Sequence, residues 1–182
     1  MNRMLIALAA LATPVAVFTT VQSAEAQAQT CSAAGPPCIY SIKFICGDQP
    51  AIPSLKPPSE PPVKPGNYAT AINIHNFHQI PVTIQKSAVI ANPEEKDFGP
   101  ISMTRVKRVG AGQAFEIDCQ DILSLFQPQP TNSFIKGFVE LRGSFPTLSV
   151  TAVYTAQATT AATAPSGPVS IEVVPVQPFT GP

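Results

Sequence analysis

Two histidines and a group of nearby carboxylates are the residues whose types could support metal chemistry. His75 and His78 end one strand-like segment and enter the turn after it, and a charged loop follows the next such segment. Imidazole and carboxylate together suit zinc or copper, so a metal site would join the histidines to Glu94, Glu95 or Asp97. Because the spacing specifies no third ligand, we expect His75 and His78 to be turn and surface residues, and we predict no cofactor.

Three further carboxylates, Glu116, Asp118 and Asp121, are close enough in sequence to consider acid–base chemistry of the kind glycosidases perform. Glu116 and Asp118 alternate with apolar residues, which predicts that both face solvent. The sequence contains no Gly-x-Ser-x-Gly elbow, phosphate-binding loop or dinucleotide fingerprint. We therefore predict no catalytic residue and no enzymatic activity.

The chain has four cysteines, Cys31, Cys38, Cys46 and Cys119, and their spacing fits neither C-x-x-C redox chemistry nor the usual zinc pattern. Four cysteines allow three connectivities. We favour Cys31 with Cys38, across a turn rich in Gly and Pro, and Cys46 with Cys119. Closing the second, much longer loop would contribute roughly 4 kcal/mol.

These disulfides require an oxidising compartment, and the first 26 residues read as a signal for export. Arg3 precedes the apolar run Met4–Ala12, and Ala24-Glu25-Ala26 forms a small-residue cleavage site. A membrane anchor is the alternative, but Thr13-Pro14 and Thr19-Thr20 interrupt the apolar sequence. We expect cleavage after Ala26, or two residues later, and a secreted or periplasmic protein without a membrane span.

Removing residues 1–26 takes away one basic and one acidic residue from the 11 of each, so the mature domain is neutral. Nucleic acid binding needs a clustered basic face. The densest basic group, Arg105, Lys107 and Arg108, is predicted to line a solvated strand. We therefore expect no nucleic acid partner.

The rest of the chain alternates apolar and polar residues over short segments, with 21 prolines that disfavour long helices. Eight strands are predicted, at 39–46, 67–75, 82–90, 101–109, 114–119, 134–142, 148–155 and 169–174. We expect hairpins between 67–75 and 82–90 and between 134–142 and 148–155, edge strands at 101–109 and 169–174, and a helical turn capped by Asp121. The predicted fold is an all-β, antiparallel, Greek-key sandwich of immunoglobulin-like outline, with a small barrel as the alternative.

One domain at 39–176 should follow an arm at 27–38 that holds the small cysteine loop. A Pro-rich crossover at 47–66 and an Ala/Thr/Pro-rich loop at 156–168 interrupt this domain, and a tail at 177–182 ends the chain.

Three strings, Asn67–Asn76, Phe115–Cys119 and Phe134–Val139, give the chain a family resemblance. It resembles small exported bacterial β-sandwich proteins to which no activity is attached, over roughly residues 39–174. The resemblance implies a secreted one-domain β protein and carries no ligand or catalytic residue with it.

Export, fold and absent catalytic motifs together favour a non-catalytic envelope or extracellular module that binds a protein or a surface polymer. A metal- or small-ligand-binding protein anchored on His75 and His78 is the first alternative, and an enzyme acting on cell-wall or carbohydrate material is the second. Self-association through the edge strand Val169–Val174 is a further possibility.

Overall fold

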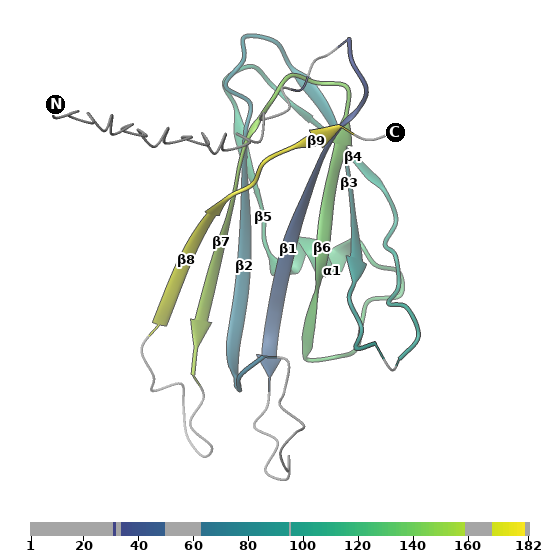
Figure 1. Ribbon diagram of the computed structural model, residues 1–182, viewed down its shortest axis with the longest axis vertical. Coiled ribbons are helices and arrows are strands. Elements are labelled where there is room, and N and C mark those ends of the chain that lie inside the picture. Colours follow the sequence, from purple (N-terminus) through teal and green to yellow (C-terminus); the bar gives the residue numbers. More distant parts are fainter. Residues whose placement is uncertain (1–30, 32–33, 50–62, 95, 159–168, 181–182) are drawn as a thin grey trace, which may run out of the picture.

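The computed structural model describes residues 31, 34–49, 63–94, 96–158 and 169–180. The predicted signal peptide, most of the Pro-rich crossover and most of the Ala/Thr/Pro-rich loop lie outside these residues. Among the residues described, no helix is long and apolar enough to cross a membrane. In this part of the chain, nine antiparallel strands form one strongly curled sheet, and one short helix lies behind it (Figure 1).

The main path of the sheet runs β4-β3-β6-β1-β2-β7-β8, while β5 pairs with β2 and β9 pairs with β1. The strands are β1 Cys38–Gln49, β2 Gly66–His75, β3 Val82–Ile90, β4 Arg105–Val109, β5 Ala114–Ile117, β6 Phe134–Gly143, β7 Ser149–Gln157, β8 Val169–Pro175 and β9 Phe179–Thr180. The helix α1 spans Cys119–Ser124.

The sheet curls because β1 and β2 separate soon after they meet. They pair only where Gly47–Gln49 lies against Gly66–Tyr68. Farther along, the same edge of β2 pairs with β5 instead, so β1 and β5 are held apart by the thickness of the core. Gly47 lies at this corner with a φ of 97°, and a Cβ there would collide with the carbonyl oxygen of Ser133, so only glycine fits.

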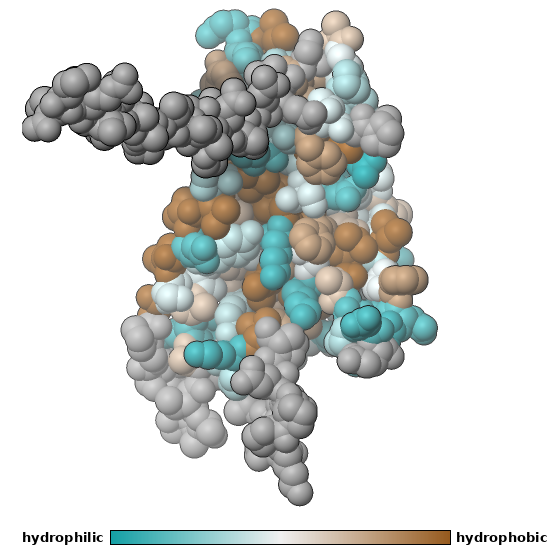
Figure 2. Space-filling view, viewed as in Figure 1, coloured by the Kyte–Doolittle hydropathy of each residue, from teal (hydrophilic) through white to brown (hydrophobic). Residues whose placement is uncertain are grey.

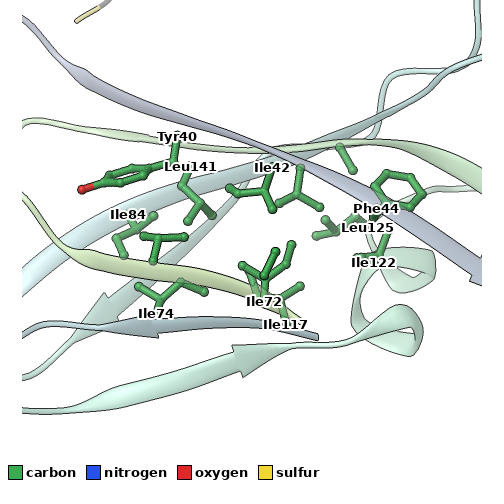
Figure 3. Close-up of a cluster of buried hydrophobic side chains, with 14 of the residues drawn as sticks. Tyr40, Ile42, Phe44, Ile72, Ile74, Ile84, Ile117, Ile122, Leu125 and Leu141 are labelled. Carbon is green, nitrogen blue, oxygen red and sulfur yellow. The ribbon is translucent and has the colours of Figure 1, made fainter. Parts of the chain in front are cut away.

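The core fills the space that the curled sheet encloses. Alternate residues of β1 point inward, and they meet residues of β2, β5 and α1 across the interior (Figure 3). The largest fully buried side chains include Tyr40, Phe44 and Phe145 together with the aliphatic residues Ile42, Ile72, Ile74, Ile84, Ile117, Ile122, Leu125, Leu141 and Val139. The phenol of Tyr40 donates to Leu148 O at 3.0 Å and accepts from Leu148 N at 2.8 Å, which satisfies its buried oxygen.

The all-β, antiparallel class predicted from the sequence is confirmed, and its assignment to a Greek-key sandwich stays a prediction. Both predicted hairpins are wrong. β2 pairs with β1, β5 and β7, while β3 pairs with β4 and β6. Likewise β6 lies between β1 and β3, whereas β7 lies between β2 and β8. Alternation reveals which side of a strand is buried, but strands that are consecutive in the chain need not be neighbours.

Three local predictions also need correction. The helix begins at Cys119 with Asp118 as its N-cap, not with Asp121, and Cys119 therefore belongs to the helix and not to the preceding strand. The edge strand predicted at 101–109 is shorter, since β4 begins at Arg105 and Ile101 makes only an isolated bridge to Val89. The expected tail contains β9, whose two residues pair with Cys38 and Ile39.

Candidate functional site

The histidines predicted as possible ligands lie at one end of the sheet, in a small cluster of rings. His75 ends β2, opposite Ser149 and Ala114. Phe77 contacts both imidazoles, with ring centroids 6.3 Å from His75 and 4.2 Å from His78. Nε2 of His78 lies 2.8 Å from the carbonyl oxygen of Thr147. His78 is therefore held by a backbone carbonyl and an aromatic ring.

The carboxylates proposed to join these histidines lie at the opposite end of β3. The nine residues of β3 separate the turn that holds His78 from the loop that holds Glu94 and Asp97, which is about 30 Å at the rise of a strand. Glu95 lies outside the described residues. The histidines therefore do not combine with Glu94 or Asp97, and the described part of the chain contains no group of three or more His, Cys, Asp or Glu side chains that could hold a metal ion.

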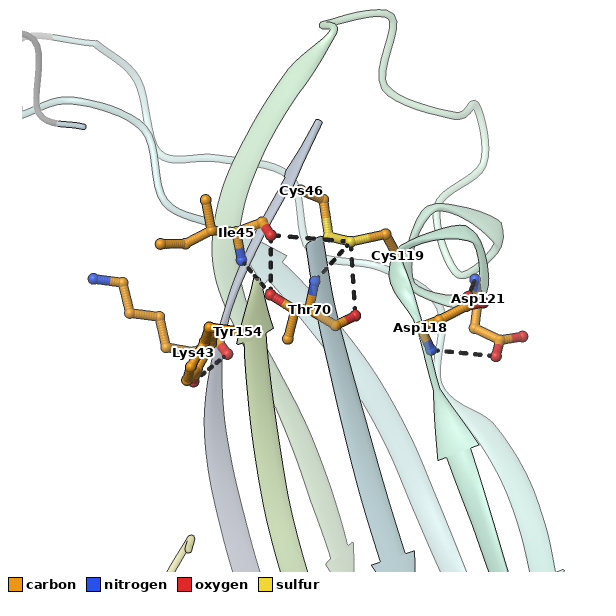
Figure 4. The surroundings of a disulfide bond; sticks show 8 residues. All are labelled: Lys43, Ile45, Cys46, Thr70, Asp118, Cys119, Asp121 and Tyr154. Carbon is orange, nitrogen blue, oxygen red and sulfur yellow. Dashed lines mark hydrogen bonds between the residues drawn. A yellow bond between two sulfur atoms is a disulfide. The ribbon is translucent and has the colours of Figure 1, made fainter. Parts of the chain in front are cut away.

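The carboxylates considered for acid–base chemistry have structural surroundings. Asp118 and Asp121 form a reciprocal capping box at the start of α1: Asp121 N donates to Asp118 Oδ1 at 2.8 Å, and Asp118 N donates to Asp121 Oδ2 at 3.5 Å (Figure 4). Glu116 is exposed on β5, opposite Asn73. These three residues do not face one another across a cleft in the way that paired catalytic carboxylates do.

Both disulfides join the cysteines that the sequence favours. Cys31 pairs with Cys38 and Cys46 pairs with Cys119, with Cα atoms 5.7 Å apart in each case. The second bond ties the end of β1 to the start of α1, at the corner where β1 leaves β2 (Figure 4). Two disulfides are consistent with an extracellular or periplasmic protein.

The separation of β1 from β2 opens a groove beside β1, and this groove is the candidate functional site. Its walls are formed by β1 on one side and by residues of β2, β7 and β8 on the other. It has a volume of about 290 Å³ and combines aromatic, charged and small side chains: Lys43, Ile45, Tyr68, Ala69, Tyr154, Thr155, Ala156, Ser170 and Glu172. Figure 2 shows the face of the molecule on which β1, β7 and β8 lie.

Side chains from β2 and β7 hold the edge of β1 in place along this groove. Thr70 Oγ1 accepts from Ile45 N at 3.0 Å and donates to Ile45 O at 2.9 Å, while the phenol of Tyr154 donates to Lys43 O at 2.9 Å (Figure 4). Thr70 N donates to the Cys119 sulfur at 3.2 Å. Thr70, 2 % exposed, thus replaces the backbone ladder that β1 and β2 no longer form.

The electrostatics of the groove centre on Tyr154 and Glu172, which lie opposite each other on β7 and β8. Burial raises the pKa of the Tyr154 phenol, and the nearby Glu172 carboxylate raises that pKa further. Lys43, on the facing wall, supplies an ammonium group. The groove therefore presents a cation, an anion, a hydroxyl from Ser170 and two aromatic rings to a ligand.

Sequence reasoning missed this groove because it depends on how strands are placed and not on any motif. The alternation of β2 and β7 correctly placed Thr70 and Tyr154 on the faces that turn inward. Nothing in the sequence, however, shows that Thr70 lies beside Ile45 or that Tyr154 reaches Lys43, which is 111 residues away in the chain.

Two larger hollows lie at the loop end of the sheet. One, of about 440 Å³, lies between Pro100-Ile101 and the segment Phe126–Asn132, and another, of about 610 Å³, follows the loop Val89–Ile101. Loops form their walls, and the first has no charged side chain in its lining. The groove beside β1 is smaller, but strands hold most of its lining residues in fixed positions, and we therefore regard it as the stronger site.

The basic residues singled out from the sequence lie on the edge strand β4. Arg105 donates to Ser124 O at 2.7 Å, and Lys107 Nζ lies 5.8 Å from the centroid of the Phe115 ring. Lys86 on β3 lies opposite Arg105, and burial, more than the neighbouring cations Lys107 and Arg105, lowers its pKa, while Asp121 acts in the opposite direction. These side chains thus connect β3 and β4 to β5 and α1 at the far side of the core.

No protein-family model matches the chain, and no curated protein or solved structure is significantly similar to it.

Proposed function

We propose that the protein is an exported, non-catalytic binding module that holds a surface polymer in the groove beside β1. The observation that carries this proposal is the groove itself, where Tyr68, Tyr154, Lys43, Ser170 and Glu172 surround a site of about 290 Å³. Ligand sites commonly combine apolar and aromatic walls with a few well-placed polar groups. The two disulfides and the predicted signal peptide support a location outside the cytoplasm.

The hydrogen bonding along β1 favours a polymer of sugar units over an extended peptide as the ligand. Thr70 already occupies both backbone groups of Ile45, and Tyr154 occupies the carbonyl of Lys43. A peptide that added to β1 as a further strand would have to displace these bonds. A ligand recognised by side chains and by aromatic surfaces avoids this cost, and sugar units, which carry hydroxyl groups around an apolar ring face, fit such a groove.

A blocking substitution tests this proposal. Ser170 is exposed and lines the groove, so Ser170→Arg should fill the groove without disturbing the core. We expect the wild-type protein and Ser170→Ala to bind the same members of an array of bacterial cell-wall and capsular oligosaccharides, and Ser170→Arg to lose at least tenfold in affinity. Binding that Ser170→Arg leaves unchanged would place the ligand elsewhere, and failure of the wild-type protein to bind any glycan would reject the polymer.

A further inference from the structure

The two edge strands at the ends of the main sheet path, β4 and β8, differ in how well they are protected against pairing with further strands. Among the strands that the structure describes, β4 pairs only with β3 at one end and carries the charged residues Arg105, Lys107 and Arg108. At the other end, β8 pairs with no described strand except β7, and its outward side chains Val169, Ile171 and Val173 are 55 %, 67 % and 60 % exposed. Soluble proteins usually blunt a free edge with charge, because unpaired strands recruit other strands. We propose that β8 is a dimerisation strand, which pairs antiparallel with β8 of a second copy.

The backbone of β8 offers the groups that such pairing needs. Val176 N donates to Val150 O, which makes these two residues a hydrogen-bonded pair of the antiparallel ladder. Since backbone groups alternate in direction along a strand, Ser170, Glu172 and Val174 point theirs toward β7. Val169, Ile171 and Val173 therefore direct their N–H and C=O groups outward. Pro175, which has no N–H, ends this edge.

Only one two-fold register uses all of these outward groups. If Ile171 lies opposite Ile171 of the second copy, Val169 lies opposite Val173, and every outward N–H and C=O finds a partner. The alternative register, centred on Glu172, places two carboxylates directly opposite each other, which is destabilising. It also places Pro175 opposite Val169, where one hydrogen bond is lost.

The side chains are self-complementary in the register centred on Ile171. On one face, the three apolar residues of each copy form a single continuous stripe, which removes them from water. On the other face, Glu172 of each copy lies opposite Ser170 of the other, so a hydroxyl donor meets a carboxylate acceptor. Because Ser170 and Glu172 also line the groove, the dimer would place the two grooves side by side across the two-fold axis.

Sedimentation of the mature protein with matched variants tests the dimer. Ile171 on β8 and Val106 on β4 are both 67 % exposed on edge strands. We expect the wild-type protein and Val106→Lys to approach twice the monomer mass as concentration rises, and Ile171→Lys, which opposes two like charges, to stay monomeric over the same range. A wild-type protein that stays monomeric throughout, or an Ile171→Lys that still doubles in mass, would overturn the proposal.

Cysteine substitution tests the register independently. Hydrogen-bonded partners in an antiparallel ladder have Cα atoms about 5.5 Å apart, which suits a disulfide. Mild oxidation should therefore convert Ile171→Cys into a covalent dimer that a thiol reductant reverses. Val173→Cys alone should not cross-link, since its two copies lie about 13 Å apart, whereas a mixture of Val169→Cys and Val173→Cys should. Cross-linking of Val173→Cys alone, or none at Ile171→Cys, would contradict the register.

Dimerisation does not rest on the binding function proposed for the groove. Ile171→Lys alters a side chain on the face opposite the groove, and Ser170→Ala leaves Glu172 in place. A monomeric Ile171→Lys that still binds glycans would support the dimer strand and the groove separately. A dimeric wild-type protein without glycan binding would reject only the groove.

Discussion

The buried hydroxyl of Thr70 closes a gap that the backbone leaves open. Where β1 and β2 part, no described strand pairs with Ile45 on the side of β2, and a buried N–H or C=O without a partner costs about 1–3 kcal/mol. Thr70 Oγ1 satisfies both groups at once. One hydroxyl therefore supports the separation of strands that makes the groove.

Thr70→Val should expose this dependence, because it keeps the shape of the side chain and removes only the hydroxyl. Both backbone groups of Ile45 would lose their partner, and we expect a loss of about 2–3 kcal/mol in the free energy of unfolding, measured by urea denaturation. Thr70→Ser keeps the hydroxyl and is the matched control. Equal stability of Thr70→Val and Thr70→Ser would show that the two hydrogen bonds contribute nothing.

Tyr40 and Tyr154 make the stability of the folded protein depend on pH in the alkaline range. Burial raises the pKa of Tyr40, against a smaller lowering by its hydrogen bond to Leu148, and burial together with Glu172 raises the pKa of Tyr154 above the ordinary 10.0. Both phenols keep their protons in the folded state at pH values where the unfolded chain releases them. Their contribution to stability is therefore complete below pH 10.0 and is lost as the pH rises through the folded pKa values.

Spectrophotometric titration of tyrosine ionisation checks this sign. We expect the folded protein to ionise part of its tyrosine above pH 10.0, and Tyr40→Phe or Tyr154→Phe to remove part of that late component. Replacing Glu172 by Gln should bring the ionisation of Tyr154 to lower pH, since the nearby negative charge is gone. A titration that Glu172→Gln leaves unchanged would show that Glu172 does not act on Tyr154.

At the scale of elements, sequence predicts faces and edges well and neighbours poorly. Alternation of apolar and polar residues predicts the buried faces of β1 and β2. Alternation and the flanking prolines predict that β8 lies at an edge of the sheet. The pairings of β2 with β7 and of β1 with β6 cannot be predicted in this way, because paired residues such as Tyr40 and Leu141 are far apart in the sequence. The groove is a product of these pairings, so it could not be predicted.

The capping box of α1 also shows that sequence predicts an element better than its exact contacts, even between residues close in the chain. The sequence predicts a helical turn capped by Asp121, but the reciprocal bonds between Asp118 and Asp121 place the N-cap three residues earlier, at Asp118. Asp118→Ala should cost about 1 kcal/mol of stability by losing the bond to Asp121 N. Asp118→Asn retains an acceptor and should cost less. Chemical denaturation of the two variants, compared with the wild type, measures the difference.

The disulfide that ties α1 to β1 closes the longer of the two cysteine loops. Cys46 and Cys119 are 73 residues apart, and closing a loop of that length stabilises by about 4.4 kcal/mol in the chain-entropy account, against about 2.4 kcal/mol for Cys31 and Cys38. Replacing both Cys46 and Cys119 by Ala should therefore cost more stability than replacing Cys31 and Cys38. Thermal unfolding of the two double variants compares them, and the reverse order would contradict this ranking.

The molecule as a whole is a curled sheet with α1 behind it (Figure 1), and side chains of four strands leave a groove beside β1. Three contacts hold β1 in place beside this groove: the Cys46–Cys119 disulfide to α1, the hydrogen bond from Thr70 to Ile45, and the hydrogen bond from Tyr154 to Lys43. An opening held by this many fixed contacts is already shaped for a ligand, so little ordering cost remains on binding.

The most direct test of the groove is to map a bound ligand on the folded protein. Amide resonances of the isotopically labelled mature protein should be followed as an oligosaccharide that binds on the array is added. We predict that the resonances of Lys43, Tyr154 and Ser170, which line the groove, shift most. Largest shifts in the loops 91–100 and 127–132, with the groove unchanged, would contradict the account.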